Sequence, residues 1–106
     1  SLVPTTDFIL FSGDIVSNGS VTGDWDTWFD NGEDFNESHV VYHSLGNHEA
    51  QSSGYQNDTN IFVLPESSSG KELYYSFTMG DAIFICLNSE DPGNTTQYNW
   101  LVSTLQ

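Results

Sequence analysis

Two short motifs in this sequence combine side chains that bind metal ions with one that can transfer a proton. Gly13-Asp14 offers a carboxylate, and Gly46-Asn47-His48-Glu49 offers an amide, an imidazole and a second carboxylate. Carboxylate and amide oxygens suit divalent or trivalent first-row metal ions. An imidazole next to such ions can donate a proton to a leaving oxygen. The residue types therefore predict that Asp14 and Asn47 bind metal and that His48 lies beside it.

Each motif directly follows an apolar run typical of a buried strand. The runs are Asp7–Ser12 and His39–Ser44, and both are short and nearly continuous. Strand ends of α/β proteins often hold functional side chains. Either motif alone could be an ordinary polar turn, but the two together at strand ends favour a functional site.

A helix is predicted between these two strands. Trp25, Trp28 and Phe29 have the spacing of one apolar helical stripe, which we expect to pack in the core. Ser20 or Thr22 could provide the N-terminal cap, and Asn31-Gly32 should end the helix. The following segment, 33–38, reads as a polar connection.

The second half of the chain predicts a hairpin and a final helix. Leu73–Phe77 and Ala82–Leu87 flank a turn at Met79-Gly80-Asp81, and a helix should run from Thr95 to Gln106. The segments 50–60 and 66–71 read as irregular polar loops. The order β-α-β, hairpin, α indicates an α/β layered fold with a mixed sheet.

Charge excludes several classes of partner. The 106 residues include fifteen acidic side chains, one lysine and no arginine, for a net charge of −14. A nucleic acid or an anionic membrane would find no basic surface here, and no apolar run is long enough to span a membrane. Cys86 lies in an apolar run and reads as a small buried hydrophobe rather than a nucleophile.

Sequons for N-linked glycans predict an exported protein. They begin at Asn18, Asn36, Asn57 and Asn94, all in expected loops or helix starts. With the acidic composition, they favour an extracellular or secreted glycoprotein.

The two motifs resemble a known enzyme family. Asp7–Asp14 and Leu45–Glu49 are similar to the second and third motifs of the calcineurin-like metallophosphoesterases. The stretches 73–77, 87–90 and 97–101 are similar to the purple acid phosphatase branch. The resemblance implies an α-β-β-α sandwich with mixed sheets and a centre of two transition-metal ions, Fe, Zn or Mn.

The same resemblance assigns a role to each candidate residue. Asp14 would bridge the two metal ions, and Asn47 would bind the second. His48 would contact the phosphate and protonate the leaving group or stabilise the transition state. The substrate would be a phosphate ester.

Departures from the family pattern limit what this chain could do alone. The family's first motif would precede Ser1, and its later histidine motifs, including Gly-His-x-His, would follow Gln106. Residues 1–106 are therefore expected to be an internal part of one domain, inactive until the rest of the domain or another chain completes the site. Position 17 is Ser17 where the purple enzymes have a tyrosine, which favours a Zn, Mn or Fe pair of the wider family.

We therefore predict a metal-dependent phosphoesterase of the acid-phosphatase type. Two alternatives stay open: a phosphodiesterase, and a non-catalytic acidic surface glycoprotein that keeps the phosphoesterase fold. A zinc protease is excluded, because an HExxH motif beginning at His48 would need a second histidine where Ser52 stands.

Overall fold

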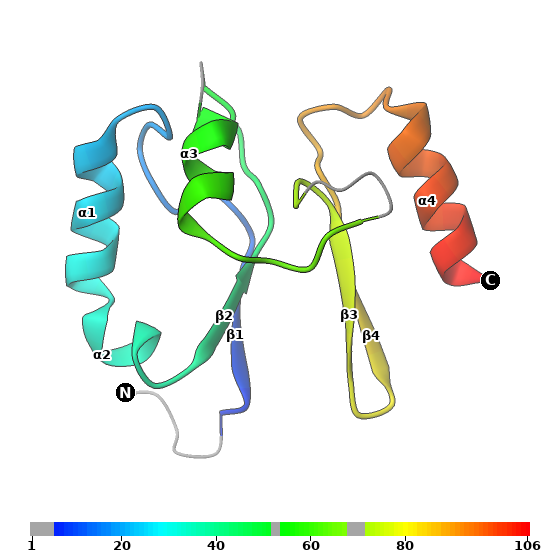
Figure 1. Cartoon of the computed structure of the whole chain (residues 1–106), viewed down its shortest axis with the longest axis horizontal. Helices are drawn as coiled ribbons and strands as arrows, with labels where there is room; N and C mark the ends of the chain where they lie inside the picture. The colour runs from blue at the N-terminus through cyan, green and yellow to red at the C-terminus, as the bar shows by residue number, and fades with distance from the viewer. Residues whose placement is uncertain (1–5, 52–53, 68–71) are drawn as a thin grey trace.

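A computed structural model describes residues 6–51, 54–67 and 72–106. The described part is a flat, mixed α/β unit with principal extents of 38 × 36 × 18 Å. Figure 1 shows the elements in chain order: β1 (Phe8–Phe11), α1 (Thr22–Asn31), α2 (Glu33–Asn36), β2 (Val40–His43), α3 (Gly54–Ile61), β3 (Tyr75–Met79), β4 (Ala82–Cys86) and α4 (Thr95–Leu105).

Strands β1 and β2 form a parallel pair, joined by α1 and α2. Phe8 pairs with Val40 and Phe11 with His43, and the Ser44 amide extends the pairing by donating to the Phe11 carbonyl at 3.0 Å. Parallel strands end at the same edge of a sheet. The loops that follow β1 and β2 therefore begin side by side, although the motifs lie far apart in the sequence.

Strands β3 and β4 form an antiparallel hairpin, as the sequence predicts. Tyr75 pairs with Cys86 and Met79 with Ala82. Gly80 lies in the turn with φ +59°, a backbone conformation that glycine adopts without steric cost. The first strand begins at Tyr75, two residues later than the apolar run suggests.

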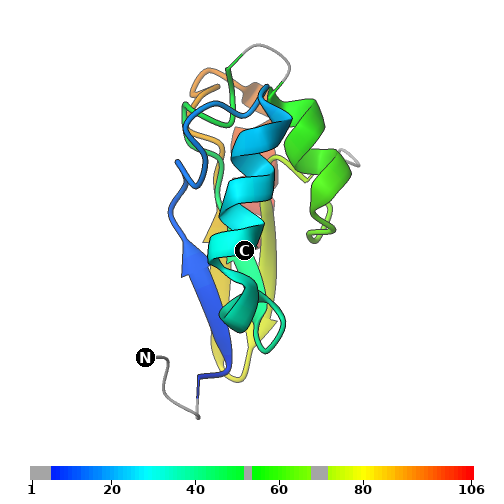
Figure 2. The same cartoon turned by 90° about the vertical axis from the view of Figure 1, so that its left-hand side faces the viewer.

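Aromatic side chains join the two sheets. The Phe8 ring makes edge contacts with Tyr42, Phe77 and Phe84, and Tyr42 stacks on Phe77 with centroids 3.8 Å apart. Figures 1 and 2 agree that α1 flanks the β1–β2 pair, and Figure 1 shows α4 on the far side of the hairpin. Aromatic packing therefore joins the two small sheets, while the buried apolar side chains of the described core are Val16, Trp25, Leu45, Leu64, Tyr74 and Tyr75.

Trp25 and Trp28 of the expected α1 stripe face this core, whereas Phe29 is 37% exposed and stacks on Phe62. Trp25 is 1% exposed, and the Trp28 ring contacts Phe11 of β1 at 5.8 Å between centroids. The expected side-chain cap is not formed, because Val21 occupies the N-cap position. Asp24 in the first turn instead accepts the Asn18 amide hydrogen at 2.9 Å.

Two helices lie where the sequence predicts polar loops. One is the single-turn α2, and the other is α3, which covers the second half of the segment 50–60 and ends at Ile61. Helix α3 has few apolar residues, so its sequence lacks a clear stripe. It is held instead by a polar contact, because its buried Asp58 bonds to His43 at 2.7 Å. Of the expected loop 66–71, residues 68–71 lie outside the described residues, as does Ser52.

Candidate active site

The two predicted motifs meet at the ends of β1 and β2. The backbones touch closely, because a Cβ built on Gly13 would lie 2.8 Å from the Gly46 nitrogen. The His48 amide then donates to Asp14 Oδ1 at 3.1 Å. Asp14 and His48, which are 34 positions apart in the chain, are thus neighbours in space.

Backbone conformation presents the Asp14 carboxylate. Gly13 has φ +97° and Asp14 has φ +53°, so the chain makes a left-handed turn as it leaves β1. Such a turn is uncommon for a residue with a side chain. A Cβ at Gly46 would collide with Asp14 Oδ1. Glycine at position 46 therefore makes room for the carboxylate.

Glu49 holds the two loops together through hydrogen bonds from their backbone amides. It is 0% exposed, and its Oε2 accepts the amide hydrogens of Asp14 and Gly46, both at 2.8 Å. Its Oε1 accepts the amide hydrogen of Val16 at 3.2 Å. A buried carboxylate is stabilised by such donors in place of water. Sequence reasoning gave Glu49 no separate role; its place after His48 in the motif was the only signal.

His48 is held in one orientation. Its Nδ1 hydrogen-bonds to the Ser17 carbonyl, and because a carbonyl only accepts, Nδ1 must carry the hydrogen. The His48 carbonyl in turn accepts the Gly19 amide hydrogen at 2.8 Å. Nε2 is therefore the ring nitrogen left for chemistry.

Asn47 projects from the same turn. Its side chain is exposed, and its amide has no hydrogen-bond partner within 6–51, 54–67 and 72–106. The amide oxygen is thus free to bind a ligand. The structure places Asn47 in the turn between Gly46 and His48, next to the Asp14 carboxylate.

A buried pair of side chains, His43 and Asp58, lies next to the strand end that leads into the site. His43, 2% exposed, bonds through Nε2 to Asp58 of α3, and its carbonyl accepts the Tyr75 hydroxyl hydrogen. Burial raises the pKa of the Tyr75 hydroxyl, so this group stays a donor. The contacts tie β2, α3 and the hairpin together just before the Gly46 turn. Sequence reasoning missed the pair, since nothing local links Asp58 to His43.

The side-chain atoms available at the site are of the kinds that bind metal ions, but they are few. Within the described part of the chain, Asp14 Oδ2, the Asn47 amide oxygen and His48 Nε2 have no hydrogen-bond partner, and hard oxygen donors like the first two suit divalent cations. Among the described residues, no group of three or more His, Cys, Asp or Glu side chains could hold an ion. The residues present therefore fit part of a metal site.

Comparison with known proteins identifies the family. The family model described as calcineurin-like phosphoesterase matches residues 2–103. The chain belongs to the calcineurin-like phosphoesterase family. No curated protein and no solved structure matches the chain.

Family membership gives the general chemistry of the site. Calcineurin-like phosphoesterases hydrolyse phosphoesters, and they generally use divalent metal ions. The mixed α/β structure with two small sheets is consistent with a fragment of that fold. Within the described ranges, no helix has the length and apolar character needed to cross a membrane.

Proposed function

We propose that this phosphoesterase hydrolyses phosphate monoesters at a binuclear metal centre of the acid-phosphatase type. The observation that supports the proposal is the contact between the motifs: His48 is bonded to Asp14 through its amide and to Ser17 through its ring. An oxygen ligand and a proton donor are thereby held next to each other before any substrate binds. Such preorganisation is a main source of enzymatic rate enhancement.

The charge of the chain requires a cationic partner for the phosphate. With one lysine, no arginine and a net charge of −14, its own side chains cannot neutralise a bound phosphate. A pair of metal ions would supply positive charge there and lower the pKa of the attacking water. Asp14 would bridge the pair and Asn47 would bind one of its members.

His48 performs the proton transfer in this proposal. Its Nδ1–H bond to the Ser17 carbonyl holds the ring and leaves Nε2 as the nitrogen that can meet a substrate. A protonated Nε2 hydrogen-bonds to the ester oxygen and gives it the proton as the P–O bond breaks. Glu49 does not enter the reaction; it holds the amides that set this geometry.

Residues outside this chain complete the centre. The remaining ligands would come from the rest of the polypeptide or from another chain, and residues 1–106 would be an internal part of a single sandwich domain. We assign the chain to the purple acid phosphatase branch on the resemblance of its stretches 73–77, 87–90 and 97–101. Ser17, in place of that branch's tyrosine, favours Zn, Mn or Fe without a tyrosinate ligand.

Extracellular location is part of the proposal, with glycans at the sequons. Asn18 and Asn94 lie at loop or cap positions. The amide nitrogen of Asn36 is buried and has no partner among the described residues, and that of Asn57 donates to the Gly19 carbonyl at 2.9 Å. A glycan at either of these last two would have to be attached before the local structure forms.

One observation favours a second candidate, a non-catalytic module. The described residues hold no cluster of three or more metal-binding side chains, as expected for a phosphoesterase fold kept as an acidic surface glycoprotein. A phosphodiesterase is the third possibility, and it differs only in the substrate accepted.

Asp14→Asn in the intact protein distinguishes these candidates. We expect bound transition metal, measured by elemental analysis, and hydrolysis of p-nitrophenyl phosphate to fall together, with activity lost by about 1,000-fold or more. The control is Asp81→Asn, at the exposed hairpin turn. Unchanged metal content and no hydrolysis by the parent protein would support the non-catalytic module. Faster hydrolysis of bis-p-nitrophenyl phosphate than of the monoester would favour the phosphodiesterase.

A further inference from the structure

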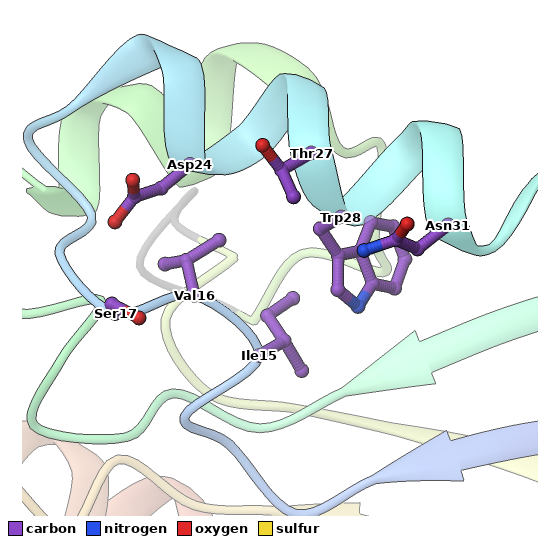
Figure 3. Close-up of a pocket in the computed structure, with 7 residues that line it drawn as sticks. All are labelled: Ile15, Val16, Ser17, Asp24, Thr27, Trp28 and Asn31. Atoms are coloured by element: carbon purple, nitrogen blue, oxygen red, sulfur yellow. The ribbon is translucent and has the colours of Figure 1, made fainter.

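A small pocket lies between α1 and the loop that follows Asp14 (Figure 3). Its volume is about 210 Å³, and it is lined by Ile15, Val16, Ser17, Asp24, Thr27, Trp28 and Asn31. The residues come from the loop on one side and from one face of α1 on the other. None of them has a role in the proposed chemistry beyond the Ser17 carbonyl.

The pocket adjoins the candidate active site through a shared loop. Ile15 directly follows Asp14, and the Ser17 carbonyl accepts the hydrogen from His48 Nδ1. Three residues of extended chain span at most about 11 Å, so the pocket begins within that distance of Asp14. A phosphoester with its phosphate at Asp14 and His48 could therefore reach the pocket with its alcohol portion.

The pocket offers hydrogen-bond donors and acceptors that the described residues leave unused. The Ser17 hydroxyl and the Asn31 amide have no partner among residues 6–51, 54–67 and 72–106, and neither has the Trp28 indole N–H. Figure 3 shows the indole nitrogen of Trp28 on the side of the ring nearest Ile15. Asp24 uses Oδ2 to accept the Asn18 amide hydrogen, which leaves Oδ1 as a further acceptor.

Charge and packing exclude other ligand classes. Asp24 is the one ionisable group among the lining residues, and the chain has a net charge of −14, so a second phosphate or a carboxylate would be repelled. A cation could pair with the Asp24 carboxylate, but it would leave the Trp28 indole N–H, which can only donate, without an acceptor, and it would find no open aromatic face. The Trp28 ring instead contacts Phe11, Phe29 and other phenylalanine rings of the core and offers the pocket a donor edge. A neutral ligand with several hydroxyl groups meets all of these constraints.

We propose that this pocket binds the alcohol portion of the phosphoester substrate, and that this portion is a small neutral polyol of the size of a sugar. The inference rests on the proposed function. Pockets for drug-sized ligands run from roughly 300 to 1,000 Å³, so the observed volume suits a smaller group. Ser17, Trp28 and Asn31 would bind hydroxyl groups, and Asp24 would accept from them.

Binding can be tested without any activity. The 106 residues include three tryptophans, whose indole N–H signals are separate NMR probes. Methyl glucoside added to the intact protein should shift the Trp28 signal. Trp25, whose indole N–H is bonded to the Gly19 carbonyl at 2.8 Å, and Trp100 should stay in place. An unchanged Trp28 signal, or equal shifts of all three, would overturn the proposal.

Substrate preference provides the second test. Trp28→Phe removes the indole N–H but keeps an aromatic ring, and Asn31→Ala removes an exposed amide that makes no hydrogen bond among the described residues. Either change should lower the ratio of kcat/KM for glucose 1-phosphate to that for p-nitrophenyl phosphate by about three- to tenfold, the value of one hydrogen bond. The matched controls on α4 are Trp100→Phe and Asn99→Ala, which should leave the ratio unchanged.

The two tests separate this inference from the proposed function. An unchanged ratio in both pocket variants of an active enzyme would overturn the polyol pocket and leave the phosphoesterase standing. An intact protein that hydrolyses neither ester, but whose Trp28 signal still shifts with methyl glucoside, would refute the proposed function and keep the pocket as a polyol site.

Discussion

The two halves of the molecule bury polar groups for different purposes. In the parallel half, formed by β1, β2 and the helices beside them, Glu49 accepts amide hydrogens from residues up to 35 positions away. In the hairpin half, Asn88 and Gln97 exchange two bonds across 9 positions: the Asn88 amide donates to Gln97 Oε1 at 2.7 Å, and Gln97 Nε2 donates to the Asn88 carbonyl at 3.1 Å.

Strand direction explains the difference. The parallel pair brings the loops that follow the carboxyl ends of its two strands to the same edge. Their backbones must be held in place there before their side chains can act together. The hairpin places its strand ends at opposite edges, so its buried amides only anchor α4 to the strand beside it. The buried polar contacts that join separate loops therefore lie in the half in which we place the chemistry, and the Tyr75 hydroxyl of the hairpin donates into the same half, to the His43 carbonyl.

Removing the Glu49 carboxylate should have the largest effect. Glu49→Ala leaves buried amide hydrogens without an acceptor, which should lower the free energy of unfolding by about 4–5 kcal/mol. Glu90→Ala, an exposed acid beyond the hairpin, is the control and should cost less than about 0.5 kcal/mol. Urea denaturation measures both. Equal, small losses would show that Glu49 does not hold the loops.

A matched pair of deletions tests whether the two halves differ in function. Asp58→Ala unpairs buried His43, and Gln97→Ala unpairs Asn88; each should lower the unfolding free energy by about 2–3 kcal/mol. Only the first should also lower kcat/KM, by about tenfold, because it loosens the strand that leads to Gly46. The assay is run well below each variant's melting temperature. Equal activity losses from both deletions would remove the functional distinction.

Two glycine substitutions sharpen the comparison at the turn itself. Gly46→Ala would push a methyl group into Asp14 Oδ1, so activity should fall by about 100-fold, while stability falls by about 1–3 kcal/mol. Gly93→Ala, where an added Cβ meets nothing within 4 Å, is the control in the hairpin half. An active Gly46→Ala enzyme would show that the position of Asp14 tolerates displacement.

The smallest effect is expected in alkaline solution, from Tyr75 and Cys86 on the paired strands of the hairpin. Burial raises the pKa of both groups above the ordinary values of 10.0 and 9.0. The folded protein therefore keeps protons that the unfolded chain releases, so stability is complete below about pH 9 and declines above it. For one group the limit is about 1.4 kcal/mol per pH unit, and the partial exposure of Cys86 keeps its share lower.

Urea titrations at pH 7, 9 and 10 measure this decline. Cys86→Ala should reduce it, because the thiol no longer contributes to the difference in bound protons. Stability that stays level through pH 10 in the parent protein would contradict the raised pKa values.

Local pattern predicted the strands and the helices with an apolar stripe. The runs around Phe8–Phe11 and Val40–His43 are strands, because each pattern depends on neighbours in the sequence. Trp25 and Trp28 of the helical stripe pack as expected, whereas the third member, Phe29, stays 37% exposed. Helix α3 was missed for the opposite reason. Its polar sequence resembles a loop, and its buried contact is with His43 on β2.

The sequence by itself determined which residues could do chemistry here: Asp14, Asn47 and His48, each in a glycine-containing turn after an apolar strand. Tertiary structure decided how they meet. Asp14 accepts a hydrogen bond from the His48 amide, and Glu49 accepts hydrogen bonds from both turns. Helix α1 forms a pocket with the loop that follows Asp14. These contacts join residues that only the parallel pairing of β1 and β2 brings together, so no pattern of neighbouring residues could have specified them.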